Sequence, residues 1–441
     1  MRAALSKRFL GALFAIAMLA LTVRIAYVLV AKSGERPLGD QVYYNAQADT
    51  NAGGNWFGDA FDGQPTAEHP PLTALVLTPV SWVSARFDDR ADSVMAHRLT
   101  MAVFGVLVVI TIGFLGRAVG GDRTGLVAAA IAAMYPGLWV NDGLIMSETL
   151  ATLAVALALL LTYRFIRRPT LGAAVATGLT CGLAAMARQE LLLLLPLTVV
   201  PVIFLAHSLE RRRRFALAGA ATLATIVVAG PWVLWNLARF DEPVTFSTND
   251  GITICGANHP RTWYGSGTGL WALNCAVYET PEGDRSLVSR ALRDRGLEYA
   301  SSHLERLPVV VVARIARVWS LYAPGQMATY NTGEGREEWV SWFAFASWWL
   351  LVPFAVFGVV DLRRHRVHLW PLLSQFVIVT ITAAAIYGLL RFRIPADVSV
   401  VVLSAAGIDS ILTRCTAPST PSVGTEPTRR LAPRPSTEAT R

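Results

Sequence analysis

Long apolar runs separated by short arginine clusters constrain the fold of this chain more than any other feature of its sequence. About ten of these runs approach or exceed the roughly 20 residues that an α-helix needs to cross the hydrocarbon core of a bilayer. Hydrophobic residues make up 53% of the 441 residues and charged residues only 16%, whereas soluble domains carry roughly 25% charged residues. The sequence therefore predicts an all-α polytopic membrane protein and excludes an ordinary soluble enzyme.

The apolar runs define the expected membrane spans. They cover residues 9–30, 97–116, 124–140, 149–166, 171–187, 191–206, 215–237, 340–360, 368–389 and 396–412. The first run is longer than a signal-peptide core and no small-residue cleavage site follows it, so an uncleaved span is expected, with cleavage as the alternative. Two shorter apolar stretches, 71–85 and 307–323, are interrupted by proline or arginine and are expected to lie flat at the interface.

The arginine clusters indicate the topology. If both short stretches lie on the outer face, the clusters near residues 117–123, 167–168, 211–214 and 363–366 all fall on the cytoplasmic side, together with both termini. Residues 1–415 then form one transmembrane domain, with large outer segments at 31–96 and 238–339. Residues 416–441, rich in Pro, Ser, Thr and Arg, are expected to form a disordered cytoplasmic tail.

The first outer segment opens with candidate catalytic and binding residues. Asp40, followed by Tyr43 and Tyr44, places a carboxylate beside aromatic rings near the membrane surface. A carboxylate can accept the proton of an attacking hydroxyl, and aromatic faces pack against sugars or isoprenoid chains. The alternative is a solvated acid next to tyrosines of the interfacial aromatic belt.

The same segment closes with Glu68 and His69 ahead of two prolines, which impose an extended backbone on the approach to the next apolar stretch. A carboxylate with an imidazole suits either a phosphate or a divalent cation. His259 in the second outer segment could complete a metal site with Glu68. The alternatives are a rigid turn with exposed polar side chains and a solvated loop histidine.

Glu148 begins the fourth predicted span and follows Ser147. This pair is typical of a helix N-cap and a first-turn acid, which stabilise the helix dipole. Alternatively, a carboxylate at the lip of the bundle and opposite Asp40 would supply a second acid, which orients the acceptor or binds a metal.

Several arginines are expected on the outer side, where the topology rule disfavours cations. Arg188, with Glu190 beside it, ends the fifth span, and Arg391 and Arg393 precede the last span. A guanidinium at membrane depth suits the phosphate of a lipid. Pairing of Arg188 with Glu190 or Glu148 and snorkelling of the late pair are the alternatives. Arg24, inside the first span, is expected to face the bundle interior.

The second outer segment contains a stretch with closely spaced glycines. Asn249 and Asn258 flank Gly251 and Gly256, a pattern that predicts a tight loop rather than a helix. Cys255 and Cys275 both fall outside the membrane, which allows a disulfide between them.

These strings together resemble the GT-C superfamily of integral membrane glycosyltransferases, and most closely its family 39 branch. That branch is related to protein O-mannosyltransferases and lipid A aminoarabinose transferase. The resemblance runs from Arg24 to about Ile411. It is carried by GDQVYY, EHPPL, MSETL, ARQELLLLLP, PWVLWN, STNDGITICGAN and RFRIP, which are short motifs whose order and placement on one membrane face are the specific signal.

The resemblance implies a GT-C fold and the inverting transfer of a sugar from a polyprenyl phosphate to an acceptor on the outer face. Asp40 stands at the family's acidic position for the base, and Glu148 at the acidic position of the second outer turn. His69 matches a position consistent with touching the donor phosphate, and Arg391 and Arg393 match the family's late arginine motif. Glu68 matches an acid that helps some relatives hold a metal. Gln41 and Trp235 depart from the pattern, which often has Glu and Arg there.

Two other readings stay open: a transporter or flippase for a lipid-linked solute, and a non-catalytic relative that assembles other envelope enzymes. The chain has no Walker loop, dinucleotide fingerprint or nucleic-acid module. The expected partners are therefore a lipid-linked sugar, an envelope glycan, glycolipid or protein acceptor, and the bilayer. The sequence does not identify the sugar or the acceptor, and it establishes no cofactor beyond the divalent cation that Glu68 and His259 could bind.

Overall fold

The structure is a computed structural model that describes residues 6–87, 93–206, 209–277 and 283–416. Within these ranges the regular secondary structure is helical, and the β-pairing is an isolated bridge between Gly58 and Pro65. The all-α prediction is therefore confirmed. Apart from Thr416, which ends the last helix, the predicted tail lies outside the described residues.

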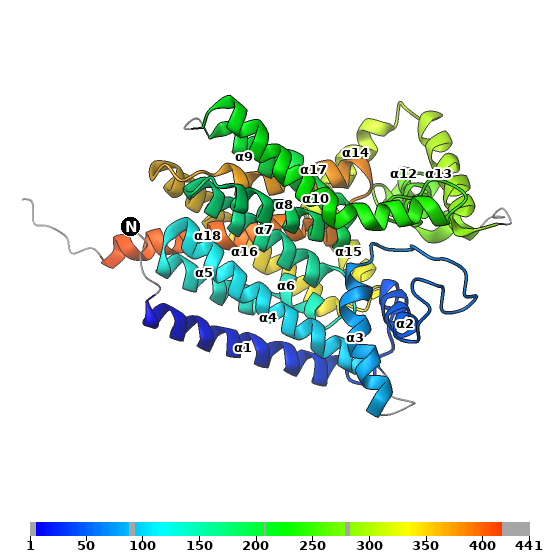
Figure 1. The fold of residues 1–441 in the computed structure, drawn as a ribbon, viewed down its shortest axis with the longest axis horizontal. Coiled ribbons are helices and arrows are strands. Elements are labelled where there is room, and N and C mark those ends of the chain that lie inside the picture. Colours follow the sequence, from blue (N-terminus) through cyan, green and yellow to red (C-terminus); the bar gives the residue numbers. More distant parts are fainter. Residues whose placement is uncertain (1–5, 88–92, 207–208, 278–282, 417–441) are drawn as a thin grey trace, which may run out of the picture.

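The helices that can cross a membrane form a bundle of roughly aligned rods (Figure 1). Of the described helices, 6 are long and apolar enough to span: α1 (Lys7–Ala31), α4 (Ser93–Gly120), α7 (Glu148–Arg167), α10 (Arg211–Arg239), α16 (Glu338–Arg364) and α18 (Ile394–Thr416) with its preceding turn η5 (Leu390–Arg393). Shorter apolar segments are α3 (Leu72–Phe87), α8 (Leu171–Ala187), the irregular helix Gln189–Leu205 and α17 (Trp370–Ala385). Six of the ten predicted spans thus match long helices, and three match shorter ones.

The remaining predicted span, 124–140, is not a single straight helix. It is divided into α5 (Asp122–Met134) and α6 (Pro136–Asp142), which meet at 58°. Tyr135 between them is extended, with φ −72° and ψ 114°. Pro136 has no N–H to continue the α5 hydrogen-bond ladder, and it restricts the residue before it to such extended angles.

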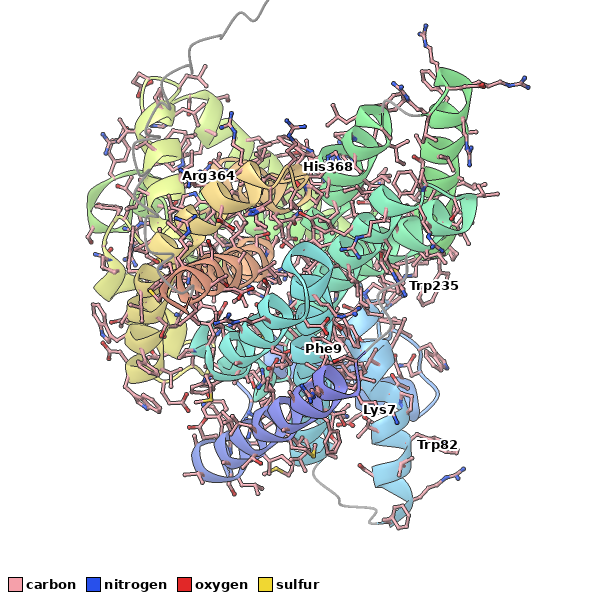
Figure 2. The ribbon with its side chains drawn as sticks, turned by 90° about the vertical axis from the view of Figure 1, so that its left-hand side faces the viewer. Lys7, Phe9, Trp82, Trp235, Arg364 and His368 are labelled. Carbon is pink, nitrogen blue, oxygen red and sulfur yellow. A yellow bond between two sulfur atoms is a disulfide. The ribbon has the colours of Figure 1, made fainter. Side chains whose placement is uncertain are left out.

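The arginine clusters gather at the end of the bundle where α1 begins. The guanidinium of Arg117 lies 5.3 Å from the ring of Phe9 on α1. Arg213 on α10 donates a hydrogen bond to the carbonyl of Pro169 at the α7–α8 turn (3.3 Å). Figure 2 views the molecule from this end and labels Lys7, Phe9, Arg364 and His368. The arginine clusters therefore lie at the same end of the bundle, as the sequence predicted.

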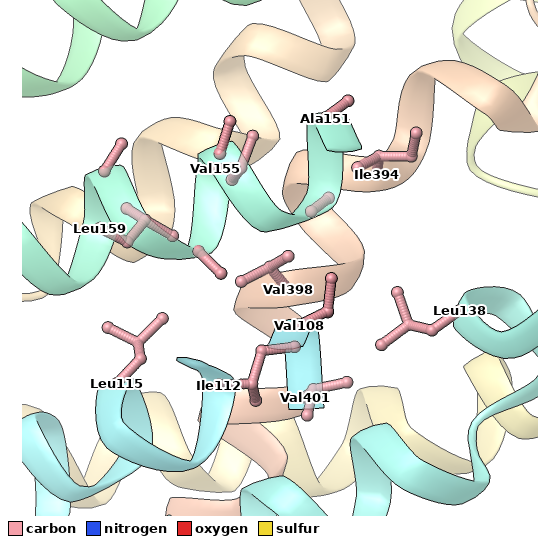
Figure 3. Close-up of a cluster of buried hydrophobic side chains, with 14 of the residues drawn as sticks. Val108, Ile112, Leu115, Leu138, Ala151, Val155, Leu159, Ile394, Val398 and Val401 are labelled. Atoms are coloured by element: carbon pink, nitrogen blue, oxygen red, sulfur yellow. The ribbon is translucent and has the colours of Figure 1, made fainter. Parts of the chain in front are cut away.

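The core of the bundle lies where α4, α7 and α18 meet. Figure 3 shows their side chains interdigitating, with Ile112, Val155 and Val398 fully buried. Helix α16 packs closely on α18 because Gly358 has no side chain, and a Cβ there would lie 1.9 Å from the carbonyl oxygen of Leu403. Close backbone approach at small residues is the usual mode of helix packing in membranes, where apolar surface alone does not favour association.

The other elements cap the opposite end of the bundle. They are α2 (Asp40–Ala52), α3, α11 (Asp250–Ala257), α12 (Pro260–Trp263), η3 (Gly265–Gly267), η4 (Leu273–Val277), α13 (Arg285–Ser301), α14 (Leu307–Val318) and α15 (Pro324–Thr332). In Figure 1, α3 runs across the direction of α1 rather than along it. The two large segments also contact each other, since Arg285 pairs with Asp59 (2.7 Å) and Gln41 donates to the carbonyl of Glu334 (3.0 Å).

The segment from Asp250 to Ala257 is helical, so the prediction of a tight loop there was wrong. Its glycines serve the packing of α11 against α13. A Cβ at Gly251 would lie 2.0 Å from the carbonyl oxygen of Ser289, and one at Gly296 would lie 2.8 Å from the Cα of Cys255. Glycine therefore marks close helix contact here rather than a turn.

Candidate functional site

A cavity of about 710 Å³ opens among the capping elements, at the end of the bundle opposite the arginine clusters. Its walls come from the start of α2, the segment before α3, the end of α8, α11, α15 and the turn before α18. The charged residues that line it are Asp40, Glu68, His69, Arg188, Glu190, Glu334 and Arg391. The predicted residues Tyr44 and Asn249 also line it, whereas Tyr43, Glu148, Asn258, His259 and Arg393 do not.

Asp40 lies at the first position of α2. The preceding Gly39 has a φ of 58°, a left-handed conformation that few other residues adopt, and it directs the chain into the helix. The carboxylate pairs with Arg391 (Nη2 to Oδ2, 2.8 Å) and faces His69 (Nε2 to Oδ1, 3.6 Å). Burial alone would raise the pKa of Asp40, but the charges of Arg391 and His69 outweigh it and hold the pKa well below its ordinary value.

His69 is clamped between aromatic rings and carboxylates. Its ring stacks on Tyr44 and meets Tyr43 edge-on, with 5.1 Å between ring centroids in each case. Glu68 lies 3.9 Å away (Oε1 to Nε2). Burial alone would lower the pKa of His69, but Asp40 and then Glu68 outweigh it and raise the pKa above its ordinary value of 6.5. The imidazolium form is thus favoured beside Asp40.

Arg391 links three carboxylates from distant parts of the chain. Its Nη2 pairs with Asp40 (2.8 Å), its Nε with Glu148 (3.0 Å) and its Nη1 with Glu334 (3.0 Å). A guanidinium can serve three acids at once because its donors are fixed in a planar fork. Arg391 is therefore the central cation of the site.

Glu148 is completely buried behind the cavity wall, and its Oε1 faces three guanidinium groups. The distances are 3.0 Å to Arg391, 3.2 Å to Arg188 and 3.6 Å to Arg336. Ser147 stands at the N-cap of α7 and Glu148 in its first turn, as predicted, but Ser147 makes no side-chain cap bond. Glu148 anchors the arginines that line the site, because a charge at full burial requires such partners.

The two other predicted arginines have different surroundings. Arg188 pairs with Glu190 (2.6 Å) as well as with Glu148, and its guanidinium lies 5.2 Å from the ring of Phe392. Arg393 points away from the main cavity and is buried against Asp397 (3.2 Å) and Ser320 (3.0 Å). The expectation that both late arginines share one pocket with Asp40 thus holds for Arg391 alone.

The polar residues of the second segment also separate. Asn249 lines the cavity. Asn258 accepts hydrogen bonds from Arg314 (2.9 Å) and Trp263 (3.2 Å), and it serves the packing of α14 against α11. Arg24 is buried as expected and pairs with Asp142 (2.7 Å).

Glu68 and His259, which were predicted to share a divalent cation, do not line the same cavity. Glu68 lines the cavity, whereas His259 caps α12 by accepting from the backbone N–H of Arg261. The described residues contain no group of three or more His, Cys, Asp or Glu side chains arranged to bind a metal. The guanidinium of Arg391 already occupies the space between the carboxylates of Asp40 and Glu148.

Cys255 and Cys275 form a disulfide, which confirms this pairing. The bond ties the segment from Gly269 to Cys275 to α11. Because that segment contributes Trp271 and Leu273 to the cavity wall, the disulfide fixes one side of the site.

Four residues that sequence reasoning did not single out belong to the site: Trp271, Glu334, Arg336 and Tyr387. Glu334 and Arg336 lie in the stretch GEGREE just before a predicted span, where charges at the membrane surface are a usable signal. No comparable signal distinguishes Trp271 or Tyr387 among the other aromatic residues of this chain.

Residues 68–235, less than half of the chain, match the model of the family described as dolichyl-phosphate-mannose-protein mannosyltransferase. No curated protein matches the sequence significantly.

Among solved structures, an oligosaccharyltransferase from Archaeoglobus fulgidus tethered to an acceptor peptide superposes with a TM-score of 0.57 at 15% identity. The alignment covers 92% of this chain and 50% of that one. The oligosaccharyltransferase AglB of the same organism, in complex with an inhibitory peptide and a dolichol-phosphate, gives 0.55 at 13% identity, with 92% and 51% covered. ArnT from Cupriavidus metallidurans bound to undecaprenyl phosphate gives 0.45 at 14% identity, with 93% and 79% covered.

The chain thus spans about half the length of the archaeal oligosaccharyltransferase that it resembles. At this level of identity the likeness concerns the fold, which AglB shares over 92% of the present chain. The motif order, the family match and this architecture agree with one another, and the chain has a GT-C fold.

Proposed function

We propose that this protein is an inverting glycosyltransferase that moves a sugar from a polyprenyl phosphate to an acceptor hydroxyl at the outer face of the cytoplasmic membrane. The observation that carries the proposal is the meeting of Asp40, His69 and Arg391 in one cavity at the end of the bundle. The arginine clusters at the other end support a cytoplasmic location for that end.

Asp40 would act as the base. The acceptor hydroxyl attacks the anomeric carbon, the bond from that carbon to the phosphate oxygen breaks, and the hydroxyl proton passes to Asp40. The electron pair leaves on the phosphate, whose charge Arg391, His69 and Arg188 are placed to neutralise. Proton removal contributes about 10²- to 10⁴-fold to such reactions, and fixed cations at the leaving group are usually the larger contribution.

The contacts of Asp40 suggest how the base becomes active. While Arg391 and His69 pair with it, its pKa is held well below the ordinary value, which makes it a weak base. A donor phosphate would compete with Asp40 for the same two cations. Donor binding would then weaken both contacts and make Asp40 more basic when the acceptor arrives, so the donor should bind before the acceptor.

The two departures from the family pattern lie outside the cavity lining. Gln41 is buried and donates to the carbonyl of Glu334 (3.0 Å), which ties α2 to the segment before α16. Trp235 lies 3.9 Å (ring centroid) from the guanidinium of Arg239, on the helix surface. Neither substitution removes a group from the cavity, which favours an enzyme over a non-catalytic relative. Charges gathered at one end of the bundle likewise favour transfer over transport, because transporters place such residues near the midplane.

The test replaces Asp40 by Asn in cells that lack the native gene. We expect Asp40→Asn to abolish transfer, so that lipid-linked sugar accumulates and one class of envelope glycan is lost. Asp49→Asn is the matched control, since Asp49 lies on the same helix but bonds Ser93 (2.7 Å) outside the cavity. Wild-type glycans in cells carrying Asp40→Asn would reject the proposal.

A further inference from the structure

Trp271 lines the cavity, and hydrogen bonds to several other segments fix the backbone around it. Gly269 donates to the carbonyl of Thr262 (2.9 Å) and its own carbonyl accepts from the N–H of Gly388 (2.9 Å). Ala272 donates to the carbonyl of Gly256 (3.1 Å). With the disulfide four residues beyond Trp271, these bonds leave the segment little freedom to move.

The indole itself is fixed against α11. Its Nε1 donates to the carbonyl of Ile252 (3.1 Å). A Cβ at Gly256 would lie 2.2 Å from that Nε1, so the ring can rest on the helix backbone only because residue 256 is glycine. Since the N–H is already bonded, the ring can offer a ligand its face but no hydrogen bond.

A series of aromatic rings connects Trp271 to the cations of the site. The ring of Tyr387 lies 6.4 Å from that of Trp271, and the ring of Phe392 lies 5.0 Å from that of Tyr387. Phe392 in turn lies 5.2 Å from the guanidinium of Arg188 and follows Arg391 in sequence. One wall of the cavity is thus aromatic and meets the charged wall at the arginines.

A glycosyl phosphate has the same two-sided chemistry. Its phosphate needs cations, and the C–H face of its sugar ring packs favourably on an aromatic face. We propose that Trp271 binds the transferred sugar by stacking, and that it determines which sugar rings the site accepts. This inference rests on the proposed function, because it assumes that the donor phosphate binds at Arg391 and Arg188.

The experiment measures the affinity of the purified full chain in lipid nanodiscs for undecaprenyl phosphate and for its mannosyl, glucosyl and arabinosyl phosphodiesters. For each variant, the affinity for a sugar-bearing lipid phosphate is divided by the affinity for bare undecaprenyl phosphate, and this ratio is compared between variants. We expect Trp271→Ala to lower this ratio up to about tenfold for at least one sugar, which is the scale of losing one aromatic contact. Binding of bare undecaprenyl phosphate should change by less than about twofold.

Two further variants and one control variant separate stacking from folding. Trp271→Phe keeps an aromatic face but lacks the N–H, and it should recover most of the lost ratio. Gly256→Ala displaces the indole without removing it, and it should lower the ratio as Trp271→Ala does. Trp339→Ala, which alters an exposed tryptophan on α16 outside the cavity, should change neither affinity.

The outcomes distinguish this inference from the proposed function. An equal loss for bare and sugar-bearing probes would overturn the sugar contact, because Trp271 would then serve the phosphate or the lipid. An unchanged ratio in both Trp271→Ala and Gly256→Ala would also overturn it. A wild-type chain that binds no probe, bare lipid phosphate included, would reject the proposed function and this inference together.

Discussion

Glu148→Gln is the most informative perturbation of the site, because it removes a charge with almost no change in shape. The side chain is fully buried, and its Oε1 is within 3.0 Å of Arg391, 3.2 Å of Arg188 and 3.6 Å of Arg336. In the variant, three guanidinium groups remain around a neutral amide. The amide NH₂ can also take the place of the oxygen that faces them, and it is itself a donor.

The magnitude follows from the burial. Removing one partner of a buried ion pair costs about 3–5 kcal/mol, because the remaining charge is left without compensation. Two other acids, Glu190 and Glu334, still pair with Arg188 and with Arg391, so we expect the lower part of that range, about 3 kcal/mol. The corresponding decrease in melting temperature is on the order of 5 °C. Transfer should decrease by at least about 100-fold, as when one fixed electrostatic donor is lost from an active site.

The assay combines thermal unfolding of the purified variant with turnover of the lipid-linked sugar pool in membranes. Glu35→Gln is the control, since Glu35 is 47% exposed and pairs with Lys32 (2.9 Å) away from the cavity. Lys32 is buried but keeps Glu337 as a second partner (2.5 Å), so losing the exposed carboxylate of Glu35 should cost no more than about 1 kcal/mol. If Glu148→Gln melted and turned over like Glu35→Gln, the reasoning that Glu148 positions the arginines would be refuted.

Three further predictions concern other contacts. The pKa of His69 is raised, so its ion pair with Asp40 stabilises the fold fully below pH 6.5 and less as pH rises through the folded-state pKa. The difference in melting temperature between wild type and His69→Gln should therefore be larger at about pH 6 than at about pH 9. A difference that does not change with pH would contradict this prediction. Replacing Cys255 and Cys275 by Ser should destabilise by about 3 kcal/mol, the loop-closure value for a separation of 20 residues, which denaturant unfolding with and without reductant can check. Gly358→Val should cost at least about 1–3 kcal/mol through overpacking of α16 on α18. Gly219→Ala, with open space around it, should not lower the melting temperature, because Ala favours a helix over Gly. Equal melting of both variants would contradict close packing at α16.

The spans and their grouping could be predicted because they depend on local properties of the chain. An apolar run of sufficient length forms a helix in lipid wherever it occurs, and arginines at its ends show which ends lie together. Asp40, His69 and Arg188 were found for a related reason. Each lies within about ten residues of a predicted span or at a proline-fixed turn, so its distance from the membrane surface can be inferred from the sequence.

Other features depend on which distant segments meet, and local patterns do not contain that information. Arg336 pairs with Glu148 (3.6 Å) and Glu334 with Arg391 (3.0 Å), although Glu334 and Arg336 lie almost 190 positions beyond Glu148 in the sequence. Gly251 marks a helix contact rather than a loop because Ser289 of α13 lies against it. Tertiary packing determines both results, and a single sequence gives no measure of it.

For the late arginines, the sequence alone does not show which of the two side chains faces the cavity. Arg391 and Arg393 lie two positions apart on the turn η5 (Leu390–Arg393), a 3₁₀-helix. With three residues per turn, positions two apart point about 240° away from each other, so one side chain faces the cavity and the other faces the bundle. Once the turn is known to be a 3₁₀-helix, the spacing shows that the two side chains cannot enter the same pocket.

The charges of the site are largely compensated before any substrate binds. Arg391 and His69 pair with Asp40, and Glu148 pairs with three arginines. A charged donor therefore cannot bind by simple addition, because each cation it uses must leave a carboxylate. Asp40 is the only one of these acids that is both partly exposed and paired with two cavity cations, so the exchange falls on the proposed base. It follows that a donor analogue without phosphate should fill the sugar subsite and yet fail to promote acceptor binding. Equal promotion by analogues with and without phosphate would show that Asp40 is active without this exchange.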